Sequence, residues 1–266
     1  MARILVRRKR RLLVSTLACA AALAAAPSVL ACTASGYTYA GLASSAKTHG
    51  VGALVTAIGA PAVSGDNGHV AGWVGVGGPG EGPNGKDEWI QVGFSGFKGS
   101  PNSDLYYEVT RAGSAPTYHR VQANLPPGTT KRLAVLEMGT RPNFWRVWVD
   151  GRAVSRPIYL PGSHGAWQGV ATAESWSETA GGACNAFGYR FQDVVVATRA
   201  GGAWQALSHP LPIRNGVNRL LLSGGSSFDA VSGRLDKLVV PLPKTGKPAP
   251  GTSLVAGPRA TASARR

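Results

Sequence analysis

Short strand-like runs, each ended by a cluster of turn-forming residues, constrain this chain more than any other feature of its sequence. The runs are rich in Val, Ile, Tyr, Trp and Phe, and Gly, Pro, Asn or Asp separate them. The clearest cover residues 69–76, 88–94, 105–110, 118–123, 132–138, 144–149, 153–159, 169–176 and 189–197. No stretch keeps the 3.6-residue period of an amphipathic helix, and the 36 Gly and 18 Pro among 266 residues would interrupt one. The sequence therefore predicts an all-β protein.

Two dipeptides predict hairpins between these runs. Asp150-Gly151 is a two-residue turn signal, because Gly accepts the positive φ that a type I′ turn requires. Asn215-Gly216 is a second such signal, and it predicts a hairpin that joins residues 211–214 to residues 218–222. About a dozen strands without an internal repeat favour a two-sheet antiparallel β-sandwich of the jelly-roll kind over a propeller. We expect residues 32–240 to form this domain.

The first 31 residues have the parts of an export signal. Residues 7–11 are all cationic, residues 12–30 are rich in Ala, Leu and Val, and small residues precede Cys32. We therefore expect cleavage before Cys32 and a secreted, extracellular protein. The arginines also fit a loose twin-arginine signal, so the export route stays open. A retained membrane anchor fits less well, because Pro27 and Ser28 interrupt an apolar stretch that is short for a bilayer.

Two of the three cysteines remain after export. Cys19 leaves with the signal, whereas Cys32 and Cys184 enter an oxidising compartment. Two remaining thiols predict one disulfide, Cys32–Cys184, which would stabilise the fold by about 4–5 kcal/mol on the loop-entropy model. The alternative is lipidation of Cys32, since residues 29–32 resemble a bacterial lipobox, although Leu30 is larger than the residue that such a box prefers there.

The C-terminal residues 241–266 have the composition of a tail. They are rich in Pro, Gly, Ala and Ser, carry basic residues and show no periodic apolar face, which predicts disorder. Residues 242–246 match the LPXTG pattern of sortase substrates, so attachment to a cell wall is an alternative. Prolines and Arg259 interrupt the hydrophobic stretch that the pattern requires after it.

The formal net charge of +15 is concentrated at the two ends. Residues 1–31 hold six basic residues, residues 244–266 hold five, and all 13 acidic residues lie between these segments. The central part therefore carries 17 basic residues against 13 acidic ones, which is typical of a soluble surface. It has no basic cluster interleaved with aromatic residues, and we expect no nucleic-acid partner. We also expect a monomer without a stable membrane anchor.

The common catalytic and metal-binding motifs are absent from the sequence. It contains no H-E-x-x-H, no C-x-x-C, no phosphate-binding loop and no G-x-S-x-G. The five histidines are scattered, and none forms a ligand pair at strand spacing. We expect them in loops or at the surface, and we expect neither a metal site nor a cofactor; they are His49, His69, His119, His164 and His209.

The period-2 alternation of strands predicts which polar side chains share a face. Asp104, Tyr106 and Glu108 project from one side of their strand, so two carboxylates share that side. Gln91 projects away from the apolar residues of its own strand, and Glu174 projects from the side opposite small residues. A solvated strand face would explain each residue taken singly.

Five segments in fixed order resemble a known family. They contain T-Y-A-G, W-V-G-V-G-G, I-Q-V-G, D-L-Y-Y-E and A-E-S-W, at residues 38–41, 73–78, 90–93, 104–108 and 173–176. The glutamic peptidases (eqolisins, peptidase family G1) show N-W-x-G, W-V-G-I-D-G, L-Q-T-G, D-x-W-Y-E and A-E-W in the same succession. The chain thus resembles a bacterial, secreted glutamic peptidase over residues 38–197. The resemblance implies a concanavalin A-like β-sandwich.

The resemblance also implies a catalytic dyad. The family's glutamine falls on Gln91, and its glutamate falls on Glu174. A carboxyl group can activate a water and later protonate the leaving amine, while a neutral amide stabilises the oxyanion. Such chemistry favours acid pH. On this basis we expect an acid endopeptidase that hydrolyses peptide or protein substrates.

Three further residues are implied to support the dyad or to bind substrate: Trp73, Asp104 and Glu108. Among the departures from the family pattern, Gly77 replaces its aspartate and Tyr39 replaces its tryptophan. The Gly- and Pro-rich residues 78–86 also lengthen the segment from Trp73 to Gln91. The loss of that acidic residue favours the alternative function, a non-catalytic secreted sandwich that binds glycans or peptides on its concave face.

Overall fold

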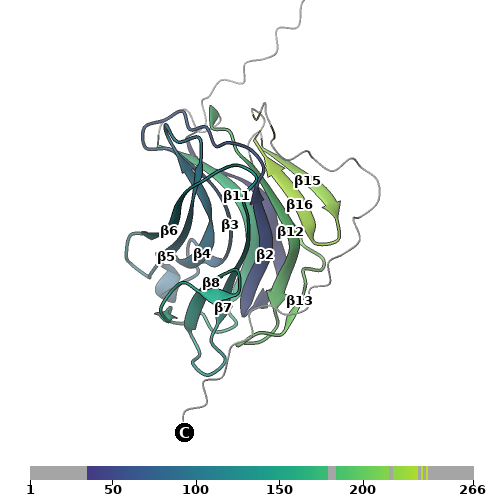
Figure 1. Cartoon of the computed structure of the whole chain (residues 1–266). Coiled ribbons are helices and arrows are strands. Elements are labelled where there is room, and N and C mark those ends of the chain that lie inside the picture. The colour runs from purple at the N-terminus through teal and green to yellow at the C-terminus, as the bar shows by residue number, and fades with distance from the viewer. Residues whose placement is uncertain (1–34, 179–183, 216–217, 233–234, 236–237, 239–266) are drawn as a thin grey trace, which may run out of the picture. The chain divides into compact units, whose positions relative to one another are not determined.

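The computed structural model describes residues 35–178, 184–215, 218–232, 235 and 238, all within one unit that spans residues 31–266. These residues form β-strands and one short 3-10 turn, η1 (Pro83–Gly85), as Figure 1 shows. Among them, no helix is long and apolar enough to cross a membrane. The predicted all-β class is confirmed.

One sheet has seven strands in the order β14-β1-β11-β3-β4-β5-β6, and each neighbouring pair is antiparallel. In chain order its strands are β1 (Gly36–Thr48), β3 (His69–Gly78), β4 (Glu88–Phe97), β5 (Ser103–Thr110), β6 (Thr117–Leu125), β11 (Trp167–Ser177) and β14 (Leu211–Arg214). Strands far apart in sequence are neighbours here, because β11 lies between β1 and β3.

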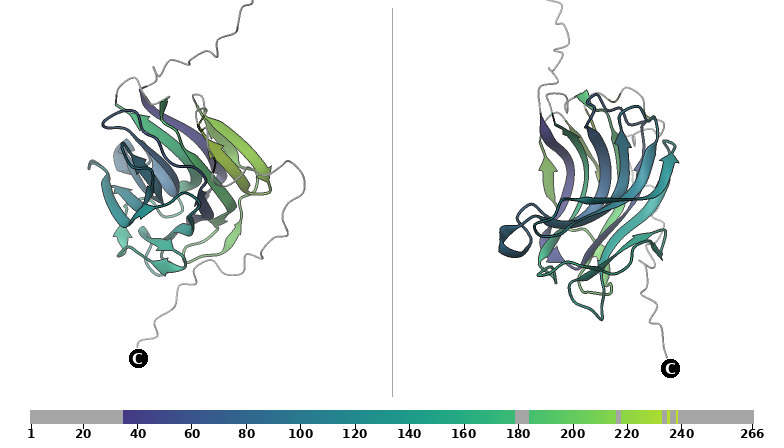
Figure 2. Two further views of the ribbon diagram at one scale, coloured as in Figure 1. Left: turned by 45° about the horizontal axis from the view of Figure 1, so that its top comes forward. Right: turned by 90° about the vertical axis from the view of Figure 1, so that its left-hand side faces the viewer.

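The second sheet has nine strands, in the order β10-β8-β7-β2-β12-β16-β15 with β9 paired to β8 and β13 to β12. They are β2 (Gly50–Ala57), β7 (Thr130–Glu137), β8 (Phe144–Val149), β9 (Arg152–Ala153), β10 (Ile158–Tyr159), β12 (Gly188–Ala197), β13 (Trp204–Ala206), β15 (Arg219–Gly224) and β16 (Ser227–Val231). The two sheets form two curved layers, seen from further sides in Figure 2. The predicted two-sheet antiparallel β-sandwich is therefore confirmed.

The core lies between the sheets and follows the alternation of the strands. Val74 of β3 and Val92 of β4 belong to it, together with the fully buried Tyr189 and Phe191 of β12. The layers lie close together at Gly72, where an added Cβ would lie 2.3 Å from the ring of Tyr189. A glycine at this position lets an aromatic ring of one sheet lie against the backbone of the other.

The two predicted hairpins have different outcomes. Asp150 and Gly151 have φ of 49° and 77°, and the flanking strands β8 and β9 pair across them, so that prediction is confirmed. The hairpin at Asn215-Gly216 is wrong, because β14 pairs with β1 in one sheet whereas β15 pairs with β16 in the other. Asn215 instead extends the contact with β1, since its backbone N–H donates to the Tyr39 carbonyl at 3.2 Å.

Several predictions lie outside the described residues. These are the signal peptide at residues 1–31, the tail at residues 241–266 and the cysteine at position 32. The Cys32–Cys184 disulfide therefore stays a prediction, as does lipidation of Cys32.

Candidate active site

The candidate site lies on the outer face of the seven-stranded sheet, which we define as the face turned away from the nine-stranded sheet. Antiparallel register places side chains of this face in rows across the strands. One row contains Tyr39, Glu174, Ala71, Ser95 and Asp104. A parallel row contains Gly75, Gln91, Glu108 and Tyr118. All five residues predicted from the sequence, including Trp73, lie on this face, and alternation predicted the side from which Gln91, Asp104, Glu108 and Glu174 project.

Glu174 is the most enclosed carboxylate of this face, with a residue exposure of 5%. Its Oε1 lies 3.4 Å from Nε2 of His69, which projects from β3. The His69 ring stacks on Trp176, with 5.7 Å between the ring centroids, and Tyr37 contacts the same ring edge-on. Aromatic packing therefore holds the imidazole beside the carboxylate.

Gln91 is also buried, and its side-chain amide is oriented by Tyr106. Nε2 of Gln91 donates to the Tyr106 hydroxyl at 2.9 Å. Burial raises the pKa of Tyr106 well above its usual value, and the charges of Glu174 and Glu108 raise it further. Tyr106 therefore stays protonated, and because its oxygen accepts from Gln91, its own O–H can donate toward the outer face.

Glu108 is the second carboxylate of the site. Its Oε1 accepts a hydrogen bond from the indole N–H of Trp89 at 3.0 Å. Burial is the main cause that raises the pKa of Glu108, and the charge of Glu174 adds to it, although the Trp89 hydrogen bond and His69 act in the opposite direction. The charge of Glu174 thus disfavours ionisation of Glu108, and acid pH favours a proton on Glu108.

The same two carboxylates affect the tyrosines of β1. Burial, followed by the charges of Glu174 and Glu108, raises the pKa of Tyr37 to about 12. The pKa of Tyr39 is raised further by burial and by the same charges. Tyr37 and Tyr39 stack with 5.8 Å between their centroids, so two neutral hydroxyl-bearing rings border the site.

Trp73 lies between Gln91 and Glu174. Glu174 is opposite Ala71 on β3, Gln91 is opposite Gly75, and Trp73 occupies the row between them. The two backbone positions are therefore about 10 Å apart across the sheet and about 13 Å apart along it. Within the described residues, no hydrogen bond joins the two side chains directly. Any direct cooperation between them requires a water or a substrate to bridge the space beside Trp73.

Asp104 occupies the side of the site nearest to β6. Its carboxylate accepts hydrogen bonds from Arg120 Nη1 at 3.2 Å and from the backbone N–H of Asn124 at 3.0 Å. These contacts tie Asp104 to the β5–β6 pair. Of the sequence-predicted acids, Asp104 is thus the one that is held by a guanidinium.

The contacts that the histidines make with buried glutamates were not predicted from the sequence. His69 is not in a loop, because it lies within β3, where its side chain is 25% exposed and contacts Glu174. A second group forms elsewhere, where His49 and His164 both contact the buried Glu137, although nothing in their spacing indicates a pair. The position of His69 could have been predicted, because it lies four residues before Trp73 in the same strand and so projects from the same face.

No known family model matches this chain, and no curated protein is similar to it in sequence. Solved structures do share its fold. A Scytalido-glutamic peptidase with a peptide-based transition-state analog has a TM-score of 0.51 and 14% identity, over 74% of this chain and 98% of that one. A second structure of that peptidase, with a transition-state analog inhibitor, has a TM-score of 0.51 and 13% identity over the same shares.

A further neighbour belongs to the eqolisin family and is in complex with the tripeptide Ala-Ile-His. It has a TM-score of 0.48 and 16% identity, over 74% of this chain and 98% of that chain. The first two likenesses show that the chain has the fold of the glutamic peptidases, at a level of identity that carries no statement about activity.

Proposed function

We propose that this protein is a secreted acid endopeptidase of the glutamic type, with Glu174 as general acid and base and Gln91 as oxyanion donor. One observation carries the proposal. The buried Glu174 shares its electrostatic environment with Glu108 and Tyr106, and Tyr106 is hydrogen-bonded to Gln91. The two carboxylates, Glu174 and Glu108, and the neutral amide of Gln91 thus form one group on the outer face of the seven-stranded sheet.

In the proposed reaction, the Glu174 carboxylate accepts a proton from a water that attacks the peptide carbonyl. Negative charge then develops on the carbonyl oxygen. The second N–H of the Gln91 amide and the O–H of Tyr106 are both neutral donors that can stabilise this charge. Glu174 finally returns the proton to the leaving amine as the C–N bond breaks.

Glu108 and His69 have supporting roles in this proposal. Glu108 acts as the second carboxyl of the pair, and its raised pKa favours a proton on this residue in the acid range. His69, at 3.4 Å from Glu174, is a positioning residue that orients Oε1 of the carboxylate. Trp73 projects from the outer face between Gln91 and Glu174. In this proposal its side chain contacts the backbone of the substrate.

The test is cleavage of a denatured protein by the mature chain between pH 2 and pH 7 with pepstatin present. We expect Glu174→Gln to lower the rate about 10²- to 10⁴-fold, because proton transfer is lost. Gln91→Ala should lower it about 10²- to 10³-fold, because a donor to the oxyanion is lost. Glu81→Gln is the matched control, since Glu81 is an exposed carboxylate near Lys47. Thermal melting checks that each variant folds.

Two results would contradict the proposal. One is a wild type that cleaves nothing across this pH range. The other is a folded Glu174→Gln variant that cleaves as fast as the wild type, which would mean that the dyad is misassigned.

A specific observation favours the second candidate, a binding module for glycans or peptides. Large aromatic side chains are exposed on the outer face, with exposures of 46% for Tyr37, 41% for Phe97 and 37% for Tyr118. Exposed rings on a sheet can stack against sugar rings or apolar side chains. Saturable binding of an oligosaccharide that Tyr118→Ala weakens, in a protein without cleavage activity, would favour this candidate over the peptidase.

A further inference from the structure

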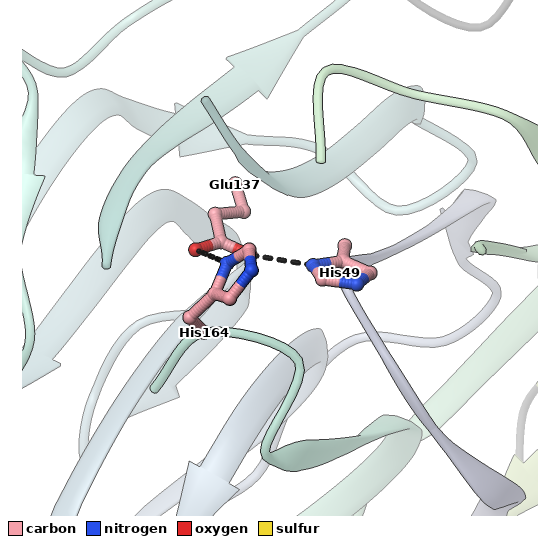
Figure 3. Close-up of side chains that lie close together, drawn as sticks. All are labelled: His49, Glu137 and His164. Atoms are coloured by element: carbon pink, nitrogen blue, oxygen red, sulfur yellow. Dashed lines mark hydrogen bonds and ion pairs between the residues drawn. The ribbon is translucent and has the colours of Figure 1, made fainter. Parts of the chain in front are cut away.

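Away from the outer face, two histidines flank a buried glutamate. Figure 3 shows His49, from the connection between β1 and β2, and His164, from the connection between β10 and β11, on either side of Glu137 at the end of β7. His49 Nδ1 lies 2.6 Å from Oε2 of Glu137, and His164 Nδ1 lies 2.8 Å from Oε1. One potential ligand atom from each of the three residues lies within 4.8 Å of the other two.

The burial of Glu137 sets this group apart from an ordinary surface cluster. Its carboxylate is fully buried, and its Oε1 also accepts from the backbone N–H of Asn143 at 2.7 Å. Within the part of the chain that the structure describes, its ion-pair partners are the two imidazoles, and no lysine or arginine lies within ion-pair distance. A fully buried carboxylate is stabilised by a partner of positive charge, so this position favours a bound cation.

We propose that His49, Glu137 and His164 form a binding site for a divalent transition metal ion, with Zn²⁺ as the ion that the ligands suit best. Two imidazole nitrogens and one carboxylate are a ligand set that zinc takes in proteins, with about 2.0–2.2 Å to each ligand atom. Each histidine binds through an unprotonated Nδ1, with its ring proton on Nε2. His164 is half-exposed, so its side leaves a position for water.

The backbone around the site is already organised for three ligands. Glu137 donates its backbone N–H to the His49 carbonyl at 2.9 Å, which fixes these two residues to one another. The His164 backbone N–H donates to Oδ1 of Asn143 at 2.9 Å, and Asn143 also donates to Glu137. The ligand atoms of one tetrahedral ion lie roughly 3.3 Å apart, and the half-exposed His164 is the side chain that we expect to adjust when the ion binds.

Gly165 makes room for the ring of His49. It has a φ of 56°, and an added Cβ would lie 2.9 Å from Cε1 of His49. The residue next to one ligand thus leaves space for the ring of the other. The ring centroids of His49 and His164 are 5.0 Å apart.

The proposed ion would tie the two sheets together at one end of the sandwich. His49 lies where the chain passes from β1 in one sheet to β2 in the other, and His164 precedes β11 of the seven-stranded sheet. Glu174 lies seven residues beyond Trp167, the first residue of β11, or about 23 Å along that strand. The metal site is therefore separate from the proposed catalytic site and does not depend on it.

The experiment is calorimetric titration of Zn²⁺ into the mature protein, purified without a polyhistidine tag and stripped with a chelator. We expect one equivalent to bind and the Tm to rise by a few degrees with saturating Zn²⁺. His164→Ala should weaken the affinity at least about tenfold, and this half-exposed side chain can be removed without opening the core. His49→Gln should weaken it similarly, whereas His119→Ala, a change on β6, should leave it unchanged.

X-ray absorption at the zinc edge should show two imidazole nitrogens and a carboxylate oxygen around the bound ion. No saturable uptake by the folded wild type would overturn the proposal, and the group would then be a hydrogen-bonded triad only. Uptake with equal affinity in His164→Ala and His49→Gln would also overturn it, because the ion would lie elsewhere.

Discussion

The side-chain amide of Gln91 donates a hydrogen bond to the hydroxyl of Tyr106, with 2.9 Å between the two atoms. The two residues lie on adjacent strands, and alternation alone predicts that each projects from the outer face of its strand. The contact fixes which atom of the amide points toward β5. The second amide N–H and the tyrosine O–H are the further donors of this pair.

Tyr106→Phe tests whether this contact serves catalysis. Removal of the hydroxyl frees the Gln91 amide to rotate and removes one neutral donor, and we expect kcat to fall about 10- to 100-fold. The KM should change little, because the donor acts on charge that develops in the transition state. Tyr107→Phe is the matched control, since Tyr107 projects from the other side of β5 and stacks on His119. An equal kcat in Tyr106→Phe and the wild type would remove Tyr106 from the mechanism.

Glu108→Gln tests the raised pKa of Glu108. Burial of the side chain is the main cause of this shift. Because the pKa in the folded state lies above the unfolded value, the protonated acid is favoured by folding. The stability linked to that proton is fully present below the ordinary pKa of glutamate and is lost as the pH rises through the raised value. We therefore expect Glu108→Gln to melt with the wild type at pH 3 and above it at pH 7.

Thermal melting at pH 3, 5 and 7 gives the comparison for Glu108→Gln. The glutamine retains an oxygen that can accept from Trp89, so the packing is preserved. Glu81→Gln, an exposed change, should show no such trend with pH. A Glu108→Gln variant that is less stable than the wild type at pH 7 would contradict the prediction.

The pair formed by Arg190 and Asp229 should contribute strongly to stability. Nε and Nη2 of Arg190 on β12 lie 2.8 and 3.1 Å from the two carboxylate oxygens of Asp229, which is fully buried on the neighbouring strand β16. Asp229→Ala leaves a largely buried guanidinium without this partner, and we expect the free energy of unfolding to fall by about 3–5 kcal/mol. Denaturant titration measures it. Lys47→Ala, which removes an exposed partner of Glu81, should cost less than about 1 kcal/mol.

Gly72→Ala tests the close approach of the two sheets. The added methyl would lie 2.3 Å from the Tyr189 ring, so the sheets or the ring must move. We expect a loss of at least about 1–3 kcal/mol, as for other overpacked cores. Gly78→Ala is the control on the same strand, because its added Cβ would meet nothing closer than 3.8 Å. Equal unfolding free energies for the two variants would show that the two sheets accommodate the added methyl group at position 72 without a loss of stability.

Local patterns predicted the strands and the sides from which their residues project. The alternation in residues 104–108 placed Asp104 and Glu108 on one face, and the structure confirms it, because a strand's two-residue period is set by its own backbone. The hairpin at Asp150-Gly151 was predicted for the same reason, since its positive φ values depend on two adjacent residues.

Contacts between distant segments depended on the tertiary structure. Asn215-Gly216 has the same local signal as Asp150-Gly151, yet β14 joins β1 and β15 joins β16, because long-range pairing decides which edge each strand completes. The sequence indicates Glu174 as a site residue, but only the pairing of β11 with β3 brings His69 to it. His49 and His164 stand 88 and 27 residues from Glu137, and no spacing rule connects them. Periodicity acts within a strand, whereas burial of two apolar faces against each other selects the register and the neighbours, and this selection assembled both sites.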